Sequence, residues 1–284
     1  MRMNPAAGRS TPLGYRMLRG ILRPMVMRLT DPHWSGAEHL PKEGGFIVVA
    51  NHVTNADPAS FGHFLVDHHV PVKVLSKAEL FTIPLFGRLI RAAGMIPVER
   101  GTATAGDSLR AAKEALARGE VIGIFPEGTL THDPDGWPMR GKTGAARLAL
   151  ETGVPVIPIA QWGIHRIMPR HTGKLATLRK QRVDVKAGPP VDLSDLLGQE
   201  ITGPVLREAT DRMMADIRRL LGEIRGETPP AKVWNLSEDG KMSEQIREKD
   251  KAERDARRGS GRKRGARRGS GRRGSGRGRE DSPQ

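Results

Sequence analysis

The sequence of 284 residues contains no cysteine, and only 4% of it is aromatic. Without cysteine the chain has no disulfide bonds, no thiolate metal ligands and no cysteine nucleophile. No pair of histidines stands at metal-ligand spacing with carboxylates beside it, so we expect neither a metal ion nor another bound cofactor. A hydrophobic content of 37% is enough for an aliphatic core in a domain of about 200 residues.

Long apolar runs are also missing, so we expect no transmembrane helix, which needs about 18 apolar residues, and no signal peptide. Residues 13–30 instead alternate apolar and basic positions, namely Leu18, Ile21, Leu22, Met25, Val26 and Leu29 with Arg16, Arg19, Arg23 and Arg28. This pattern predicts that residues 1–30 associate with an anionic membrane through an amphipathic interface helix. A helix packed on the domain is the alternative. Residues 80–86 either dip into lipid or belong to the core.

The middle of the chain alternates short apolar runs with amphipathic segments, which predicts strands and helices in turn. The expected strands are 45–50, 72–75, 95–98, 121–125, 154–160 and 183–187, and the expected helices are 58–67, 106–118, 144–152 and 204–224. This alternation predicts an α/β fold, an open and mostly parallel sheet flanked by helices. We assign residues 31–226 to this one domain and residues 227–250 to a linker.

The C-terminal residues 251–284 form a separate, strongly basic tail. They hold 13 basic and 4 acidic residues, a net charge of +9 out of +15 for the whole chain. Arg, Gly and Ser with few apolar residues cannot bury a core, so we expect a disordered tail. It suits nucleic acid phosphates, but it has no aromatic residue for base stacking. We therefore favour anionic lipid slightly over nucleic acid, and a tail without function remains an alternative.

The segment from Asn51 to Asp57 (NHVTNAD) carries the clearest chemical signal. It follows the apolar run 45–50, so His52 is expected on a loop at the end of a buried strand, where catalytic groups of α/β proteins gather. A carboxylate that bonds one ring nitrogen leaves the other as a proton acceptor, and Asp57 stands at a suitable spacing. The pair predicts a general base. Asp57 is alternatively a helix cap, with Pro58 opening the helix.

Three further segments follow in order: GMIPVER, which ends at Arg100, FPEGT at 125–129 and VPVIPIA at 154–160. Together with NHVTNAD they resemble the four blocks of the glycerolipid acyltransferases, most closely the 1-acyl-sn-glycerol-3-phosphate acyltransferases, over residues 28–225. Two positions depart from the family pattern. Leu130 stands where an arginine often follows FPEGT, and Glu99 stands where an aspartate often precedes the arginine.

The resemblance implies a role for each block. His52 takes the proton of an acceptor hydroxyl, which attacks an acyl thioester, and Asp57 orients His52. Arg100 is the best candidate to hold the acceptor's phosphate, because a guanidinium binds phosphate in bidentate fashion. The turn Glu127, Gly128 and Thr129 helps to bind the glycerol phosphate in the family, and the fourth block shapes the acyl site. Arg100 as a solvated side chain and 127–129 as a plain turn are the alternatives.

Residues 136–143 (GWPMRGKT) match the phosphate-loop pattern of nucleotide hydrolases letter for letter. A phosphate loop follows directly on a buried strand, whereas a polar turn precedes Gly136. Pro138 also removes a backbone donor from the supposed cradle. We therefore disfavour the nucleotide hydrolase. In the acyltransferase family this stretch is a basic residue that opens a helix, so Lys142 contacts a phosphate or the thioester donor, or is a surface lysine.

The sequence thus predicts an enzyme of the 1-acylglycerol-3-phosphate O-acyltransferase type. It would transfer an acyl group from acyl-CoA or acyl carrier protein to the sn-2 hydroxyl of lysophosphatidic acid, giving phosphatidic acid. Another lysophospholipid or a glycolipid is the alternative acceptor. We expect a peripheral, monotopic enzyme on the cytoplasmic face of the cell membrane. An RNA-binding protein that works through its tail is the alternative outside enzymes.

Overall fold

The computed structural model describes residues 13–98, 105–170 and 172–239. The strands are β1 (Thr30–Ser35), β2 (Phe46–Ala50), β3 (Val72–Lys77), β4 (Ile96–Val98), β5 (Val121–Ile124), β6 (Val156–Trp162) and β7 (Gln181–Ala187). The α-helices are α1 (Leu13–Leu29), α2 (Asp57–Asp67), α3 (Phe86–Ala92), α4 (Ala105–Ala117), α5 (Gly144–Thr152) and α6 (Gly203–Arg225). Three 3-10 turns, η1 (Ala37–His39), η2 (Ala78–Thr82) and η3 (Ile164–Arg166), complete the order.

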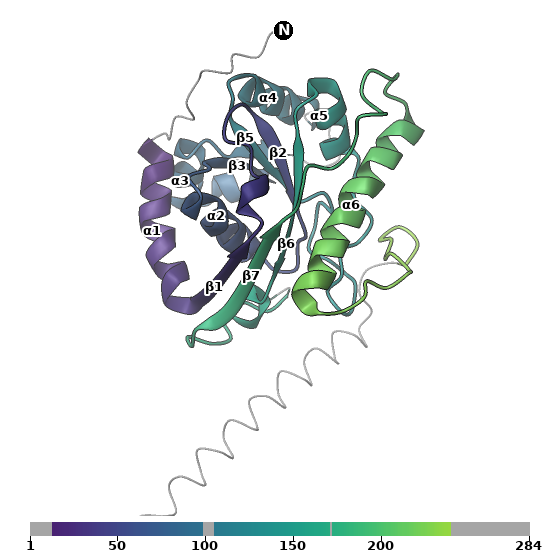
Figure 1. Ribbon diagram of the computed structural model, residues 1–284. Helices are drawn as coiled ribbons and strands as arrows, with labels where there is room; N and C mark the ends of the chain where they lie inside the picture. The colour runs from purple at the N-terminus through teal and green to yellow at the C-terminus, as the bar shows by residue number, and fades with distance from the viewer. Residues whose placement is uncertain (1–12, 99–104, 171, 240–284) are drawn as a thin grey trace, which may run out of the picture. The chain divides into compact units, whose positions relative to one another are not determined.

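The strands form one sheet in the order β1-β7-β6-β2-β5-β3-β4, with helices on both faces (Figure 1). Every neighbouring pair is parallel except β6 and β7, which are antiparallel. The expected open and mostly parallel sheet is confirmed. Because β1 pairs in parallel with β7, these two strands run opposite to the other five.

All six strands and four helices expected from the apolar pattern are present, with each end within two residues of the structure. Gly153 ends α5 in the left-handed region at a φ of 68°, as a C-terminal cap. The pattern did not predict β1 or α3. The β1 sequence TDPHWS holds a proline and few apolar residues, which suits only an edge strand, and β1 pairs with β7 alone.

Strand β2 explains how one apolar run is buried on both sides. Ile47 and Val49 pack in the cluster that contains α4, α5 and α6, whereas Phe46 and Val48 pack in the cluster that contains α2. A strand covered by helices on both faces needs no polar side, so its sequence is continuously apolar. The methionines of α6, Met213 and Met214, fill the first cluster, as its apolar face predicts.

Helix α1 packs on the domain with one face and leaves another apolar face in solvent. Tyr15 and Leu18 are buried, and the Tyr15 hydroxyl accepts the N–H of Val72 at 3.3 Å. An added β-carbon at Gly14 would lie 2.3 Å from the carbonyl carbon of Ala92, so the small residue permits the close approach to α3. The packing alternative is therefore confirmed for one face. Four exposed apolar side chains, spaced four residues apart, line the other: Leu13, Met17, Ile21 and Met25.

The segment 80–86 divides in the same way, since Phe81 is buried while Ile83 and Leu85 are exposed. None of the helices in the described ranges has the length and hydropathy needed to cross a bilayer.

The compact unit extends to Asp239, past the domain end expected at residue 226. The first part of the expected linker is held there, because the Trp234 carbonyl accepts the N–H of Arg140 at 2.9 Å. Residues 240–284, which include the predicted tail, lie outside the described residues.

Candidate active site

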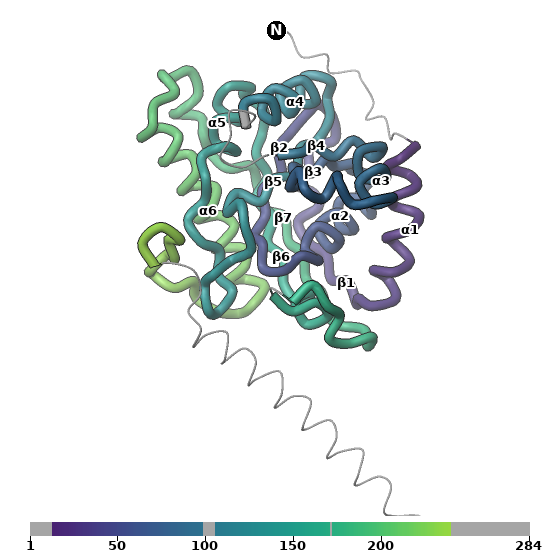
Figure 2. Tube along the Cα trace, turned by 180° about the vertical axis from the view of Figure 1, so that it is seen from behind, coloured from purple at the N-terminus to yellow at the C-terminus, as the bar shows by residue number. Residues whose placement is uncertain are grey.

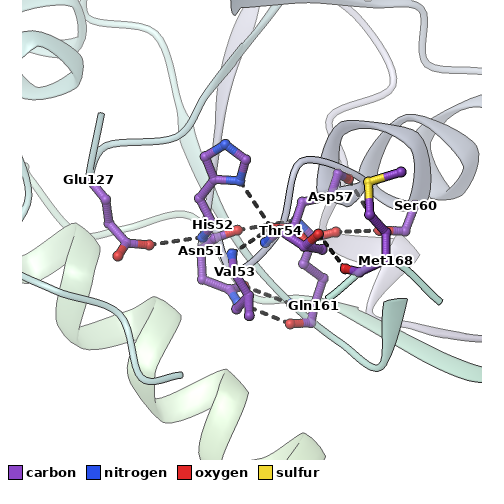
Figure 3. A network of polar contacts seen from close by, with 9 residues as sticks. All are labelled: Asn51, His52, Val53, Thr54, Asp57, Ser60, Glu127, Gln161 and Met168. Carbon is purple, nitrogen blue, oxygen red and sulfur yellow. Dashed lines mark hydrogen bonds and ion pairs between the residues drawn. The ribbon is translucent and has the colours of Figure 1, made fainter. Parts of the chain in front are cut away.

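The candidate site lies at the carboxyl ends of three adjacent parallel strands. In the sheet β2 lies between β6 and β5, with Ala50 paired to Ile159 and Val49 paired to Ile124. The chain leaves β2 at Asn51 and His52, and it leaves β5 at Phe125. The parallel directions bring these ends to one edge of the sheet, where Figure 3 shows a network of polar contacts. This is the edge at which open α/β sheets bind their ligands.

The His52 and Asp57 side chains meet as the sequence predicts. Nδ1 of His52 lies 3.0 Å from Oδ2 of Asp57. The same carboxylate oxygen accepts the backbone N–H of Val53 at 2.5 Å and of Thr54 at 2.7 Å. Three donors on one buried oxygen fix the carboxylate, so Nδ1 carries the proton and Nε2 keeps its lone pair.

The helix-capping alternative for Asp57 is wrong. Helix α2 begins at Asp57 with Pro58 in its first turn, as expected, but Ala56 is the N-cap and makes no side-chain cap bond. The Asp57 carboxylate turns back into the preceding loop and bonds the main chain there instead of the first turn of the helix. The loop from His52 to Ala56 is thus folded around the group that orients the imidazole.

The imidazole of His52 is packed on one face and open at Nε2. The Phe125 ring stacks on it with the ring centroids 4.3 Å apart and the planes 24° from parallel. Figure 3 shows the second ring nitrogen pointing away from the network. No bond from another described residue reaches Nε2, and 15% of the side chain is exposed. The nitrogen that keeps its lone pair is therefore the one that an incoming hydroxyl can reach.

Glu127 bonds the main chain on both sides of the site. One carboxyl oxygen accepts the N–H of His52 at 2.8 Å, and the other accepts the N–H of Met139 at 3.0 Å. The residue is only 2% exposed. Burial raises the pKa of the Glu127 carboxyl to about 8, although the two N–H bonds act in the opposite direction. Since both oxygens serve the main chain, this geometry favours a positioning role over direct contact with an acceptor.

Replacing Glu127 with glutamine should lower kcat about tenfold or more above pH 8, where the carboxyl is ionised and accepts on both sides, with little change in KM. An amide accepts on one side only, so the N–H of His52 or of Met139 loses its partner, at a cost of about 1–3 kcal/mol. Steady-state kinetics beside the exposed control Glu114→Gln would measure this. A kcat equal to that of the wild type would show that the His52 backbone needs no such anchor.

The raised pKa of Glu127 also makes stability depend on pH. The folded state holds the proton up to about pH 8, whereas the ordinary carboxyl releases it near 4.5. Stability from this group is therefore fully present below pH 4.5 and is lost as the pH rises through about 8. The expected slope is about 1.4 kcal/mol per pH unit. Urea unfolding across this range should show the slope in the wild type and a flatter profile in Glu127→Gln; equal profiles would contradict the assignment.

A second set of buried groups holds the loop from the other side. Asn51 and Gln161 form three bonds: the Asn51 amide donates to the Gln161 carbonyl at 3.0 Å, its oxygen accepts the Gln161 N–H at 2.8 Å, and the Gln161 amide donates to the Asn51 carbonyl at 3.1 Å. The Ser60 hydroxyl of α2 donates to the Gln161 side-chain oxygen at 2.6 Å. These bonds join β6, the start of the loop 51–56 and the helix that carries Asp57.

Three residues of the candidate site were not predicted from the sequence, namely Gln161, Ser60 and Phe125. The fourth block was expected only to shape the acyl site, but its strand continues to Trp162 and places Gln161 in the network. The available signal was a glutamine directly after an apolar run, because a buried amide needs hydrogen-bond partners. For Phe125 the sequence offered no signal, since an aromatic residue at the end of a buried strand fits the core equally well.

The predicted turn 127–129 lies beside Lys142. Gly128 has a φ of +68°, and an added β-carbon there would lie 3.0 Å from Cδ of Lys142. Glycine therefore provides both the left-handed turn and the room for the lysine stem. Thr129 is half-buried in this turn, and Lys142 is exposed just before α5. The structure thus brings Gly128, Thr129 and Lys142 together near His52, whose carbonyl accepts the N–H of Thr131 at 2.7 Å.

Two further positions that the sequence singled out are Arg100 and Leu130. Arg100, the expected phosphate ligand, lies outside the described residues, although β4 ends shortly before it at Val98. Leu130, which stands in place of the family's arginine, is buried. Lys142 is therefore the cation that the structure places against the FPEGT turn.

The stretch 136–143 does not form a phosphate loop. Trp137 and Met139 are buried, and the N–H of Trp137 donates to Asp133 at 3.1 Å. The N–H of Met139 donates to Glu127. These backbone donors serve the protein's own carboxylates, so no cradle for a nucleotide exists here.

Comparison with known proteins finds acyltransferases as similar proteins. The acyltransferase family model matches residues 31–162. The chain is 32% identical over 169 residues to the chloroplastic 1-acyl-sn-glycerol-3-phosphate acyltransferase BAT2 of Brassica napus, covering 58% of this chain and 47% of that one. It is 28% identical to the mouse 1-acyl-sn-glycerol-3-phosphate acyltransferase alpha, covering 65% and 62%. The chain spans about half the length of several curated relatives that it matches.

Among solved structures, the chain is similar to the 1-acyl-sn-glycerophosphate acyltransferase PlsC of Thermotoga maritima. The TM-score is 0.59 at 26% sequence identity, and the match covers 78% of this chain and 81% of that one. The similarity therefore reaches beyond the family model and includes most of the sheet and helices described above.

Proposed function

We propose that this chain is an acyltransferase of the family whose model matches residues 31–162, and that it transfers an acyl group from a thioester donor to the sn-2 hydroxyl of 1-acyl-sn-glycerol-3-phosphate. The product is phosphatidic acid, in phospholipid biosynthesis. The names of the similar proteins, which are acyltransferases of 1-acyl-sn-glycerol-3-phosphate, support this acceptor. The observation that carries the proposal is the pair of Nδ1 of His52 and Oδ2 of Asp57 at 3.0 Å, with Nε2 open.

The chemistry needs one base and no covalent enzyme intermediate. Nε2 of His52 takes the hydroxyl proton as the sn-2 oxygen forms a bond to the thioester carbon. The carbonyl electrons move onto its oxygen, and they return as the bond from carbon to sulfur breaks. The leaving thiolate takes the proton from the imidazolium, which Asp57 stabilises meanwhile. The ester and a free thiol leave, and His52 is neutral again.

The acceptor's phosphate is assigned to the basic side of the site. Arg100 and Lys142 supply the charge, and Gly128 with Thr129 forms the turn against which the glycerol lies. Lys142 takes on more of this task because Leu130 replaces an arginine. Glu127 supports the site from behind by holding the main chain of His52 and Met139.

Acyl-CoA or acyl carrier protein serves as the donor, and both are acidic partners that suit a chain of net charge +15. We further propose a peripheral enzyme on the cytoplasmic face of the membrane. The exposed apolar stripe of α1 would lie in the interface of an anionic bilayer, with the basic tail 251–284 attracted to its headgroups.

The test is acyl transfer by the purified protein in vesicles that contain phosphatidylglycerol, with lysophosphatidic acid and labelled acyl-CoA. Labelled phosphatidic acid is the expected product. Thiol release without phosphatidic acid would point to another lysophospholipid or a glycolipid as the acceptor. If no thiol appears with acyl-CoA or with acyl carrier protein as the donor, the proposed reaction is wrong.

A further inference from the structure

The connection between η3 and β7 exposes a mixture of leucines and cations that the proposed reaction does not use. We name residues 172–180 the 172–180 segment. Leu175 is 50% exposed and Leu178 is 74% exposed. Lys174, Arg179 and Lys180 are exposed beside them. The sequence from residue 164 to residue 183 contains no acidic residue. No ion pair to a described residue involves these three cations.

The base of this connection is fixed to the loop that carries His52. The Thr54 hydroxyl, three residues before Asp57, donates to the Met168 carbonyl at 2.6 Å. The Arg170 guanidinium donates to the carbonyls of Asp133 and Pro134 at 2.6 and 2.9 Å. Each contact belongs to a loop at the carboxyl edge of the parallel strands. The 172–180 segment therefore projects from the edge of the sheet that carries His52.

The segment lies beside the C-terminal end of α1. Gln181, which follows the segment, pairs with Thr30, which follows α1. Figures 1 and 2 both show the connection before β7 beside the C-terminal end of α1. Arg28 at that end adds a further basic residue. The leucines of the segment and the apolar stripe of α1 thus belong to neighbouring parts of the surface.

We propose that the 172–180 segment is a second lipid-contacting element, which docks on an anionic bilayer at the mouth of the active site. Leu175 and Leu178 enter the boundary between headgroups and acyl chains, and the adjacent cations contact the headgroups. This inference rests on the proposed function for its purpose, because a lysophospholipid acceptor resides in the bilayer.

Lipid fits this surface better than nucleic acid. The segment has no aromatic side chain on which a base stacks. Two exposed leucines within four residues would remain in water against a nucleic acid backbone, whereas a bilayer accepts them together with the cations. The contact also places the bilayer beside the catalytic edge, so the acceptor reaches His52 without leaving the lipid phase.

Insertion is measured directly with a tryptophan probe. Leu178→Trp in the full chain should gain fluorescence that brominated phosphatidylcholine quenches in vesicles containing phosphatidylglycerol. The matched probe is Leu197→Trp, at a leucine that is 45% exposed between β7 and α6. It should show no added quenching over the wild type. Equal quenching of both probes, or of neither, would overturn the proposal.

Binding is measured by vesicle flotation with paired variants. Leu175→Ser with Leu178→Ser should weaken binding about tenfold or more, whereas the control Leu197→Ser should not. Arg179→Gln with Lys180→Gln should weaken it about 25-fold, at about fivefold for each cation. Arg110→Gln on α4 with Arg118→Gln just after this helix removes the same charge elsewhere and should have a smaller effect. Binding by the segment variants equal to that of their controls would overturn the proposal.

Activity separates this proposal from the proposed function. The segment variants should lose transfer to long-chain lysophosphatidic acid in vesicles and keep transfer to a short-chain, water-soluble acceptor. Lost vesicle binding in a protein without any acyl transfer would leave the surface standing and refute the reaction alone. Normal vesicle binding with lost activity toward acyl carrier protein would assign the surface to the donor protein and overturn the lipid proposal.

Discussion

Replacing His52 by alanine should abolish acyl transfer, with kcat reduced about a thousandfold or more. The fold should survive, because Asp57 keeps its bonds from the N–H groups of Val53 and Thr54. Removal of the imidazole also leaves Phe125 without its stacking partner, which costs about 1 kcal/mol of stability. The variant should therefore unfold at nearly the same urea concentration as the wild type, while it releases no thiol from the donor.

The matched control for His52 is His33→Ala, a histidine of β1 that is exposed and far from the loop in sequence. It should keep full activity. If His52→Ala retained activity within tenfold of the wild type, another group would have to take the hydroxyl proton. Loss of activity together with loss of cooperative unfolding would leave the base role unproven, and His52→Gln, which keeps more of the packing, would then decide it.

Replacing Asp57 by asparagine should lower kcat about a hundredfold with little change in KM. All three donors to Asp57 reach the same oxygen, so the amide oxygen of asparagine can keep their geometry. What the variant loses is the negative charge that stabilises the imidazolium. Asp57→Ala removes the acceptor as well and leaves two buried N–H groups without partners, at about 1–3 kcal/mol each.

Steady-state kinetics and urea unfolding of both variants separate charge from structure. Asp57→Asn should be nearly as stable as the wild type, and Asp57→Ala should be clearly less stable. The control is Asp67→Asn at the other end of α2, where the carboxylate bonds Arg23 and Trp34 instead of the site. A kcat for Asp57→Asn equal to that of the wild type would show that the carboxylate charge does not serve the reaction.

The contrast between Asp57 and Glu127 shows what the sequence can and cannot predict. Spacing placed His52 and Asp57 together, because the six residues between β2 and α2 leave few conformations for the loop. The partners of Glu127 are His52 and Met139, which lie 75 residues before it and 12 residues after it. Only the order of strands in the sheet brings the first of these close, and an apolar pattern does not contain that order.

The fold itself was largely predictable from apolar periodicity. Helix α6 buries one face, so its apolar residues repeat at the helical period, whereas β2 is buried on both faces and is a continuous apolar run. Strand β1 was missed because its stability comes from pairing with β7 along its length. Helix α1 packs one face on the domain and exposes another apolar face, and its period of four residues fits either kind of face equally well.

The reversed direction of β7 has a consequence for how the chain is routed. A strand that continued the parallel order would need a long crossover back over one face, and it would begin at the far edge of the sheet. Because β7 runs the other way, it begins where β6 ends, and β1 beside it must begin there too. This one change of direction thus places two parts of the chain at the edge that carries His52. They are the end of α1 and the connection before β7, which can accept additional residues. A longer connection would project further from this edge without altering any strand of the sheet.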